Sequence, residues 1–233
     1  MAKRVLITGG NKGIGLVVTR LFQKAGYDIA VIGRDFTDFH EEGVETFSYD
    51  LTDVAGIPKL IEEIGPVDIL INNAGIDRKY PYDAYPEEEI EKIVNVNLKA
   101  PLALINGYAP LFLNKGWGRI VNVASQAAEI GHTDVWYGIT KAGLVNATKS
   151  YAALLGEKGI VVNGVAPGPV ETDMIKDSPF SERFEQLRNR TYTKRLATAE
   201  EVAKVIFWLG TDVPEYVNGE IIDINNGAQR IRV

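Results

Sequence analysis

The feature that most constrains this chain is a regular alternation of two kinds of segment along its 233 residues. Short runs rich in Val and Ile predict β-strands, and longer stretches with apolar residues three and four positions apart predict helices. Several of the short runs are apolar throughout, as expected for parallel strands that helices cover on both faces. The pattern predicts an α/β fold with a doubly wound parallel sheet, in a single domain that spans residues 1–233.

Seven strands and five helices follow from this pattern. The strands are expected at Arg4–Thr8, Asp28–Gly33, Thr46–Tyr49, Asp68–Ile71, Arg119–Ala124, Ile160–Val165 and Glu220–Ile224. The helices are expected at about Gly13–Ala25, Val54–Ile64, Glu87–Asn114, Trp136–Glu157 and Ala199–Leu209. The least regular piece, Pro167–Arg195, is either a surface excursion or a substrate lid around residues 173–195.

Composition excludes several classes of function. The chain has 25 basic and 31 acidic residues, a net charge of −6, which disfavours nucleic acid or an anionic membrane as a partner. It has no Cys, and only His40 and His132 could act as imidazole ligands, so no catalytic metal is expected. No apolar run approaches the roughly 20 residues of a membrane span, and no signal peptide is recognised, so a cytoplasmic location is expected.

A glycine-rich loop follows the first predicted strand. It reads Thr8-Gly9-Gly10-Asn11-Lys12-Gly13-Ile14-Gly15 and leads directly into the first predicted helix. Glycines let the backbone approach a ligand closely, and the amides at a helix N-terminus bind phosphate groups. The spacing differs from Gly-x-Gly-x-x-Gly, but the strand before it and the helix after it indicate a site for a dinucleotide diphosphate.

The end of the second predicted strand bears on the choice of cofactor. A basic residue at this place suits the 2′-phosphate of NADP, whereas an acid suits the ribose hydroxyl of NAD. Here the strand ends in Gly33-Arg34, and Arg34 can make a forked contact with phosphate oxygens while Lys12 adds a second charge. NADP(H) is therefore expected in preference to NAD(H), although Asp35 leaves a ribose contact open.

Three residues suggest proton-transfer chemistry. Ser125 follows the fifth strand, at the carboxyl edge of the sheet where α/β proteins bind ligands. Tyr137 and Lys141 are four positions apart and share a helix face. A nearby ammonium lowers the pKa of a phenol, so Lys141 is expected to prepare Tyr137 as a general acid and base while the hydroxyl of Ser125 holds a carbonyl oxygen.

With these residues in place, the chain resembles the short-chain dehydrogenase/reductase family over essentially its whole length. The matching motifs are, in order, Thr8-Gly9-x-x-x-Gly13-x-Gly15, Asn72-Asn73-Ala74-Gly75, Ser125 with Tyr137-x-x-x-Lys141, and Pro167-Gly168. The resemblance implies a Rossmann-type sheet of seven parallel strands, and hydride transfer between a nicotinamide and a carbonyl or secondary alcohol by a Ser-Tyr-Lys triad.

The resemblance also implies roles for other residues. Asn97 is expected to complete the catalytic set by holding a water of the proton relay. Contacts with the cofactor are expected from Thr8, Gly9, Asn11, Lys12, Gly13, Ile14, Gly15, Arg34, Asp50, Leu51, Asn73, Ala74, Gly75, Tyr137, Lys141, Pro167, Gly168, Val170 and Thr172. The family further implies a homotetramer or homodimer built on the helices Glu87–Asn114 and Trp136–Glu157.

The substrate is left open by the sequence. The residues that determine substrate specificity are expected in Glu129–Trp136 and Met174–Arg195. The segment from Lys176 to Arg195 contains six basic and three acidic residues, which gives it a local net charge of +3. This patch either attracts an anionic substrate or forms a solvated helix surface. The chain also has Asn225-Asn226-Gly227 where many relatives have Asp-Gly-Gly.

Three alternative functions are kept. A catalytically silent NAD(P)-sensing protein of the same fold would not need the Tyr–Lys pair. A 3-oxoacyl thioester reductase of fatty-acid type usually has an Arg where this chain has Gly116, although Lys158 matches another of its basic docking positions. A nucleotide-sugar epimerase or dehydratase would be expected to carry a larger domain after Thr172.

Overall fold

The computed structural model describes residues 2–78, 80–171 and 181–228, with the side chains of residues 181–184 excepted. In this part of the chain one sheet of seven parallel strands has the order β3-β2-β1-β4-β5-β6-β7. The strands are β1 (Arg4–Thr8), β2 (Asp28–Gly33), β3 (Val44–Ser48), β4 (Ile69–Asn72), β5 (Gly118–Val123), β6 (Ile160–Pro167) and β7 (Ile221–Ile224). The predicted doubly wound, Rossmann-type α/β fold is confirmed.

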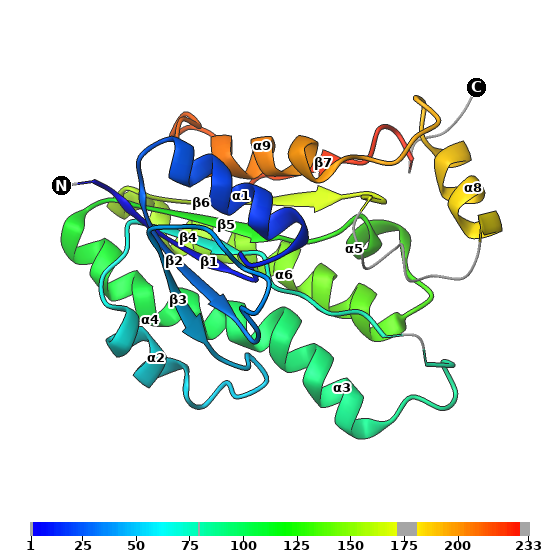
Figure 1. Ribbon diagram of the computed structural model, residues 1–233, viewed down its shortest axis with the longest axis horizontal. Helices are drawn as coiled ribbons and strands as arrows, with labels where there is room; N and C mark the ends of the chain where they lie inside the picture. Colours follow the sequence, from blue (N-terminus) through cyan, green and yellow to red (C-terminus); the bar gives the residue numbers. More distant parts are fainter. Residues whose placement is uncertain (1, 79, 172–180, 229–233) are drawn as a thin grey trace.

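Helices cover both faces of this sheet. They are α1 (Gly13–Lys24), α2 (Ile57–Ile64), α3 (Glu87–Val94), α4 (Ala100–Lys115), α5 (Ala127–Ile130), α6 (Val135–Leu155), α8 (Ser181–Arg190) and α9 (Ala199–Gly210). Figure 1 shows α1 and α9 on one side of the strands and α2, α4 and α6 on the other. None of the helices in the described ranges is long and apolar enough to cross a membrane.

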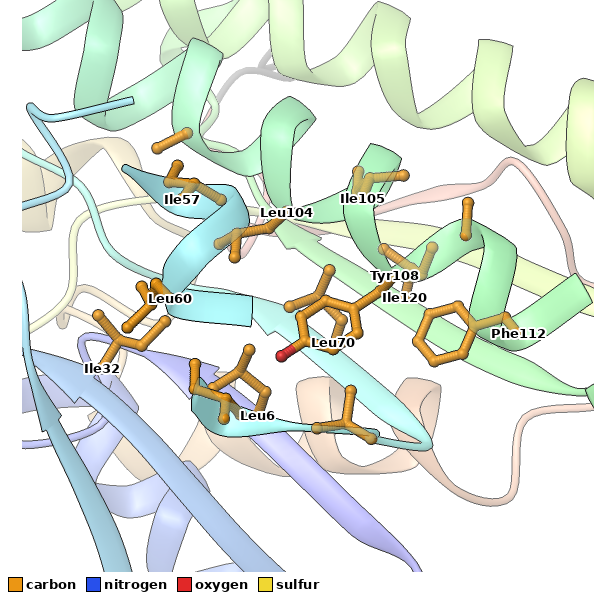
Figure 2. Packing of buried hydrophobic residues seen from close by; sticks show 14 of the residues in the cluster. Leu6, Ile32, Ile57, Leu60, Leu70, Leu104, Ile105, Tyr108, Phe112 and Ile120 are labelled. Atoms are coloured by element: carbon orange, nitrogen blue, oxygen red, sulfur yellow. The ribbon is translucent and has the colours of Figure 1, made fainter. Parts of the chain in front are cut away.

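The core has two apolar layers, one on each side of the sheet. In β1, Leu6 belongs to the layer under α2 and α4, whereas its neighbours Val5 and Ile7 belong to the layer under α1 and α9. This follows from the strand geometry, because successive side chains point to opposite faces. Figure 2 shows the first layer, in which strand residues meet side chains of α2 and α4: Leu6, Ile32, Leu70 and Ile120 against Ile57, Leu60, Leu104, Ile105, Tyr108 and Phe112.

One buried hydroxyl in this layer has no partner. The Tyr108 side chain is fully buried, its hydroxyl makes no hydrogen bond to any described residue, and burial raises its pKa. An unpaired buried hydroxyl destabilises a fold. Tyr108→Phe is therefore expected to raise the free energy of unfolding by about 1 kcal/mol in urea denaturation.

The matched control for this change is Tyr151→Phe on α6. The Tyr151 hydroxyl donates to Asn106 Oδ1 at 2.6 Å, so its removal is expected to lower the free energy of unfolding slightly. If Tyr108→Phe destabilised the protein as much as Tyr151→Phe does, the hydroxyl of Tyr108 would have a partner after all.

The predicted helix Glu87–Asn114 differs in detail from the observed one. The helical path continues from α3 to α4, but Asn95–Lys99 between them form a π-helical turn. Pro101 lacks the amide hydrogen that would bond to the carbonyl of Asn97, so the α-helical ladder is interrupted there. The hydrogen bonds instead span five residues, as in a π-helix, with the amide of Ala100 donating to the carbonyl of Asn95.

Other differences are at element boundaries. β3 begins at Val44, two residues before the predicted start, and β7 begins one residue later than predicted, at Ile221. The four-residue helix α5 was not predicted, because a single turn has no apolar periodicity to detect. Within the irregular stretch Pro167–Arg195, the described part contains helix α8.

Candidate active site

A cleft of about 1520 Å³ lies at the carboxyl edge of the sheet. The sheet order places β1 next to β4, and the chain leaves these two strands toward opposite faces, which is where doubly wound sheets bind ligands. Most of the predicted cofactor residues line this cleft: Gly9, Asn11, Lys12, Gly13, Ile14, Gly15, Arg34, Asp50, Leu51, Asn73, Ala74, Gly75, Tyr137, Lys141, Pro167, Gly168 and Val170.

The glycine-rich loop leaves room for a phosphate group at the start of α1. Gly9 and Gly13 have φ angles of +65° and +52°, which other residues adopt at a cost. A side chain on Gly15 would lie 2.0 Å from the carbonyl oxygen of Gly9, so α1 packs directly on the turn. No side chain caps α1, and the amides of its first turn therefore remain available to an anion.

Thr8 does not line the cleft, but it joins two of the loops that do. Its buried hydroxyl accepts hydrogen bonds from the amides of Asn73 and Ala74 at 3.0 and 2.9 Å. The Asn73 side chain in turn donates to the carbonyls of Thr8 and Gly9 at 3.0 and 3.2 Å. Thr8 thus fixes the segment after β4 against the glycine-rich loop.

The structure separates the roles of the two charged residues after β2. The carboxylate of Asp35 accepts hydrogen bonds from the hydroxyl and the amide of Thr37, at 2.6 and 2.9 Å, and these bonds lower its pKa. Arg34 is exposed at the cleft and makes no side-chain hydrogen bond or ion pair with the rest of the described chain. Asp35 therefore shapes its own turn, while the guanidinium of Arg34 is available to a ligand.

Ser125, Tyr137 and Lys141 are brought together at the other end of the cleft. Ser125 is the second residue after β5, and Tyr137 lies in the first turn of α6, where its amide donates to the capping carboxylate of Asp134 at 3.1 Å. Lys141 is one turn further along the same helix. Its ammonium donates to the carbonyl of Val123 at 2.8 Å and lies 5.7 Å from the centroid of the Tyr137 ring.

The acid–base properties of this pair differ from the sequence prediction. The pKa of Tyr137 is raised to about 12, mainly by burial and also by Asp77 and Asp134, while a hydrogen bond with Ser125 acts to lower it. Burial lowers the pKa of Lys141 to about 8. The expected lowering of the Tyr137 pKa by Lys141 is not seen, because burial has the larger effect on Tyr137 and Lys141 is itself desolvated.

Asn97 lies behind the cleft wall. Its side chain is fully buried, accepts from the amide of Ile76 at 2.8 Å and donates to the carbonyl of Ile76 at 2.8 Å. It therefore holds the segment that follows Gly75. The space at Gly75 is limited, since a side chain there would come within 3.2 Å of the Lys141 ammonium and 3.5 Å of Asn97 Oδ1.

The cleft wall also contains polar residues that were not predicted individually, among them Asp77, Arg78, Gln126 and His132. The first two follow β4 and the last two follow β5, so the rule that ligands bind beyond the carboxyl ends of strands could have identified them. Arg78 is held in place through its amide, which donates to Asp134 at 2.7 Å, and through an ion pair with Glu89 at 2.5 Å.

The predicted specificity segments contribute unequally to the cleft. Ile130, Gly131, His132 and Thr133 line it, whereas Trp136 does not. From α8, Gln186, Leu187 and Arg190 also line it. Thr172 and the part of the proposed lid at residues 173–180 lie outside the described residues.

Comparison with known proteins places the chain in a family. The family model described as enoyl-(acyl carrier protein) reductase matches residues 9–229. The 3-oxoacyl-acyl-carrier-protein reductase FabG of Thermotoga maritima is 35% identical, covering 97% of each chain. Gluconate 5-dehydrogenase of Gluconobacter oxydans is 30% identical, covering 96% of this chain and 93% of that protein.

Solved structures agree with this placement. The gluconate 5-dehydrogenase of Burkholderia cenocepacia, determined in complex with NADP and tartrate, superposes with a TM-score of 0.90. It is 28% identical, and the match covers 99% of this chain and 96% of that one. The chain is a member of the short-chain dehydrogenase/reductase family of oxidoreductases.

Proposed function

We propose that the protein is an NADP(H)-dependent oxidoreductase that interconverts a carbonyl group and a secondary alcohol. The observation that carries the proposal is the single cleft that joins Ser125, Tyr137 and Lys141 at one end to the glycine-rich loop and Arg34 at the other. A dinucleotide fits this arrangement, since the uncapped first turn of α1 and the side-chain-free surface at Gly9 and Gly15 leave space for its diphosphate. When bound, the nicotinamide donates or accepts the hydride.

Each catalytic residue has a distinct task in this proposal. The Ser125 hydroxyl orients the substrate oxygen by a hydrogen bond. Tyr137, whose pKa is raised to about 12, is protonated at neutral pH and donates its proton to that oxygen during reduction. The Lys141 ammonium holds the cofactor ribose and favours negative charge on the oxygens beside it. Asn97 keeps the Ile76 segment in place and completes the proton relay.

The preference for NADP(H) is supported by the charges at the adenosine end. Arg34 and Lys12 are both exposed, line the cleft, and have no ion-pair partner among the described residues. Asp35, the residue that could favour NAD, is occupied by Thr37. The solved relative from Burkholderia cenocepacia was determined with NADP.

Arg34→Gln is expected to lower kcat/KM for NADPH by about 10- to 100-fold and to leave kcat/KM for NADH nearly unchanged, because only NADPH has the 2′-phosphate. Steady-state kinetics with both cofactors measure this. Arg20→Gln is the control, since Arg20 is paired with Glu41 at 2.7 Å and lies outside the cleft lining. Equal or better efficiency of the unmodified enzyme with NADH would contradict the NADP preference.

The proposed activity is tested by following NADPH oxidation with a panel of carbonyl compounds. The names of the relatives suggest the panel: oxo derivatives of gluconate, acetoacetyl-CoA and 3-oxoacyl thioesters, with neutral ketones added. Turnover of any member is the expected result. Tight NADPH binding without turnover of any member would favour the alternative, a cofactor-sensing protein.

A 3-oxoacyl thioester reductase remains the second candidate, on the strength of the FabG relative. Gly116 ends α4 with a left-handed φ of +67°, a conformation that an Arg at this position would adopt at a cost. The backbone conformation thus gives a local reason for Gly116 in place of the usual Arg, and this reason does not involve a carrier protein.

We also propose that the protein is cytoplasmic and forms a homotetramer or homodimer through the helices containing α4 and α6. Exposed apolar side chains on these helices support an assembly of this kind: Leu111, Leu113, Ile139 and Leu154.

A further inference from the structure

The last turns of α8 contribute one basic side chain to the wall of the cleft. Gln186 and Arg190, four positions apart, lie on one face of α8 and line the cleft together with Leu187. Arg188, in the same helical turn as Arg190, is exposed and does not line the cleft. The basic patch predicted from the sequence is therefore divided, with one guanidinium facing the site and one facing away.

Arg190 carries a charge that no described residue compensates. Two other guanidinium groups of this region are already paired: Arg195 with Glu201 at 2.6 Å and Arg78 with Glu89 at 2.5 Å. Arg190 makes no side-chain hydrogen bond or ion pair within the described ranges. Three acids also line the cleft: Asp35 after β2, Asp50 after β3 and Asp77 after β4.

The chain directly after Arg190 is fixed by the C-terminal segment. Thr191 is buried, the amide of Tyr192 donates to the carbonyl of Asn226 at 3.0 Å, and Thr193 donates to Asn226 Oδ1 through its amide at 2.8 Å. A side chain at Gly227 would lie 2.0 Å from the Tyr192 ring, so the two segments are in close contact. The base of α8 is thus anchored, and Arg190 adjoins the anchor.

His132 supplies a second donor beside the reacting groups. Its Nδ1 accepts a hydrogen bond from the backbone amide of Asp134 at 3.1 Å. The other ring nitrogen, Nε2, therefore carries the N–H group and can donate a hydrogen bond. The ring lines the cleft, and its centroid is 5.0 Å from that of Tyr137. The walls of the cleft therefore carry a guanidinium from α8 and, next to Tyr137, an N–H donor from His132.

We propose that Arg190 binds an anionic oxygen group of the substrate, with His132 donating a hydrogen bond to the same molecule. This inference rests on the proposed function and specifies its substrate class as a carbonyl compound that carries a carboxylate or a phosphate. A guanidinium binds either group with paired N–H donors. The unpaired charge of Arg190 and its position on the cleft-facing side of α8 are the observations behind the assignment.

The test measures the binding of malonate and of inorganic phosphate by calorimetry, with and without NADP⁺ present. Arg190→Gln is expected to weaken binding of the preferred anion at least about tenfold, and Arg190→Lys to retain most of it. Arg188→Gln, the matched control on the same helical turn, is expected to bind like the unmodified protein. Tighter binding of malonate assigns the site to a carboxylate, and tighter binding of phosphate assigns it to a phosphorylated substrate.

Two outcomes would overturn the assignment: no binding of either anion by the unmodified protein, or equal weakening by the changes at Arg188 and Arg190. Steady-state kinetics distinguish a failure of the anion site from a failure of the proposed oxidoreductase activity. Turnover of neutral ketones without anion binding would contradict the anion site alone. Anion binding that depends on Arg190, without NADPH oxidation by any carbonyl compound, would contradict the proposed activity and leave the site standing.

Discussion

Tyr137→Phe is expected to lower kcat for carbonyl reduction by about 10³-fold, because the phenol is the proposed proton donor to the substrate oxygen. The change removes one oxygen atom and leaves the ring, so the packing of His132 against Tyr137 at a 5.0 Å centroid distance is preserved. NADPH binding, measured by its fluorescence, is expected to remain within about threefold of the unmodified protein, since the hydroxyl contributes at most one neutral hydrogen bond.

The control for this prediction is a second tyrosine of the same helix. Tyr151 lies outside the cleft lining, and its hydroxyl donates to Asn106. Tyr151→Phe is expected to keep normal turnover. Turnover by the Tyr137→Phe enzyme at a rate near that of the unmodified enzyme would contradict the role of Tyr137.

Lys141→Met is expected to have opposite effects on activity and on stability. The change removes the ammonium that is proposed to stabilise the reacting oxygens, and the expected loss in kcat/KM is about 10²- to 10³-fold. The same ammonium is nearly fully buried, and burial lowers its pKa from 10.5 to about 8. The unfolded chain therefore holds this proton more tightly than the folded chain does.

The sign of the stability effect follows from this difference. Below pH 8 the folded protein carries the desolvated charge, and the cost disappears as the pH rises from 8 to above 10.5. The pKa shift corresponds to roughly 3 kcal/mol, part of which is offset because methionine leaves the Val123 carbonyl without its donor. Lys141→Met is thus expected to raise the free energy of unfolding at pH 7 by about 1 to 2 kcal/mol.

Urea denaturation at pH 7 and pH 10 measures this effect. The increase in the free energy of unfolding caused by Lys141→Met is expected to be smaller at pH 10. Lys149 is exposed on the same helix, and Lys149→Met is expected to leave the free energy of unfolding unchanged at both pH values. A loss of stability at pH 7 in the Lys141 variant, equal at both pH values, would show that the buried ammonium is not destabilising.

Much of the fold could be predicted because its signals are local. The apolar runs and the helical periodicity specified seven strands and their parallel arrangement, and Gly9 to Gly15 marked the first strand-to-helix turn. The π-helical turn at Asn95–Lys99 could not be predicted in this way. It coincides with a proline four residues after Asn97 and with a pair of hydrogen bonds between Asn97 and Ile76, which is 21 positions away.

In the candidate site, too, the features with local sequence motifs could be predicted and those that depend on packing could not. Residues named by motif, such as Ser125, Tyr137 and Lys141, are found together in one cleft. The direction of the Tyr137 pKa shift was wrong, because desolvation depends on everything packed around the ring and not on the four-residue spacing to Lys141. The separation of Arg190 from Arg188 also depends on how α8 is anchored by Asn226, which composition cannot reveal.

The π-helical turn makes the position of Asn97 depend on the number of residues between β4 and α4. Each residue turns an α-helix by about 100°, so the removal of one residue from this stretch is expected to rotate Asn97 away from Ile76. Every side chain would keep its chemistry, and the proposed proton relay through Asn97 would still be broken. Along α3 and α4, exchanges of residue type are therefore easier to accommodate than insertions or deletions.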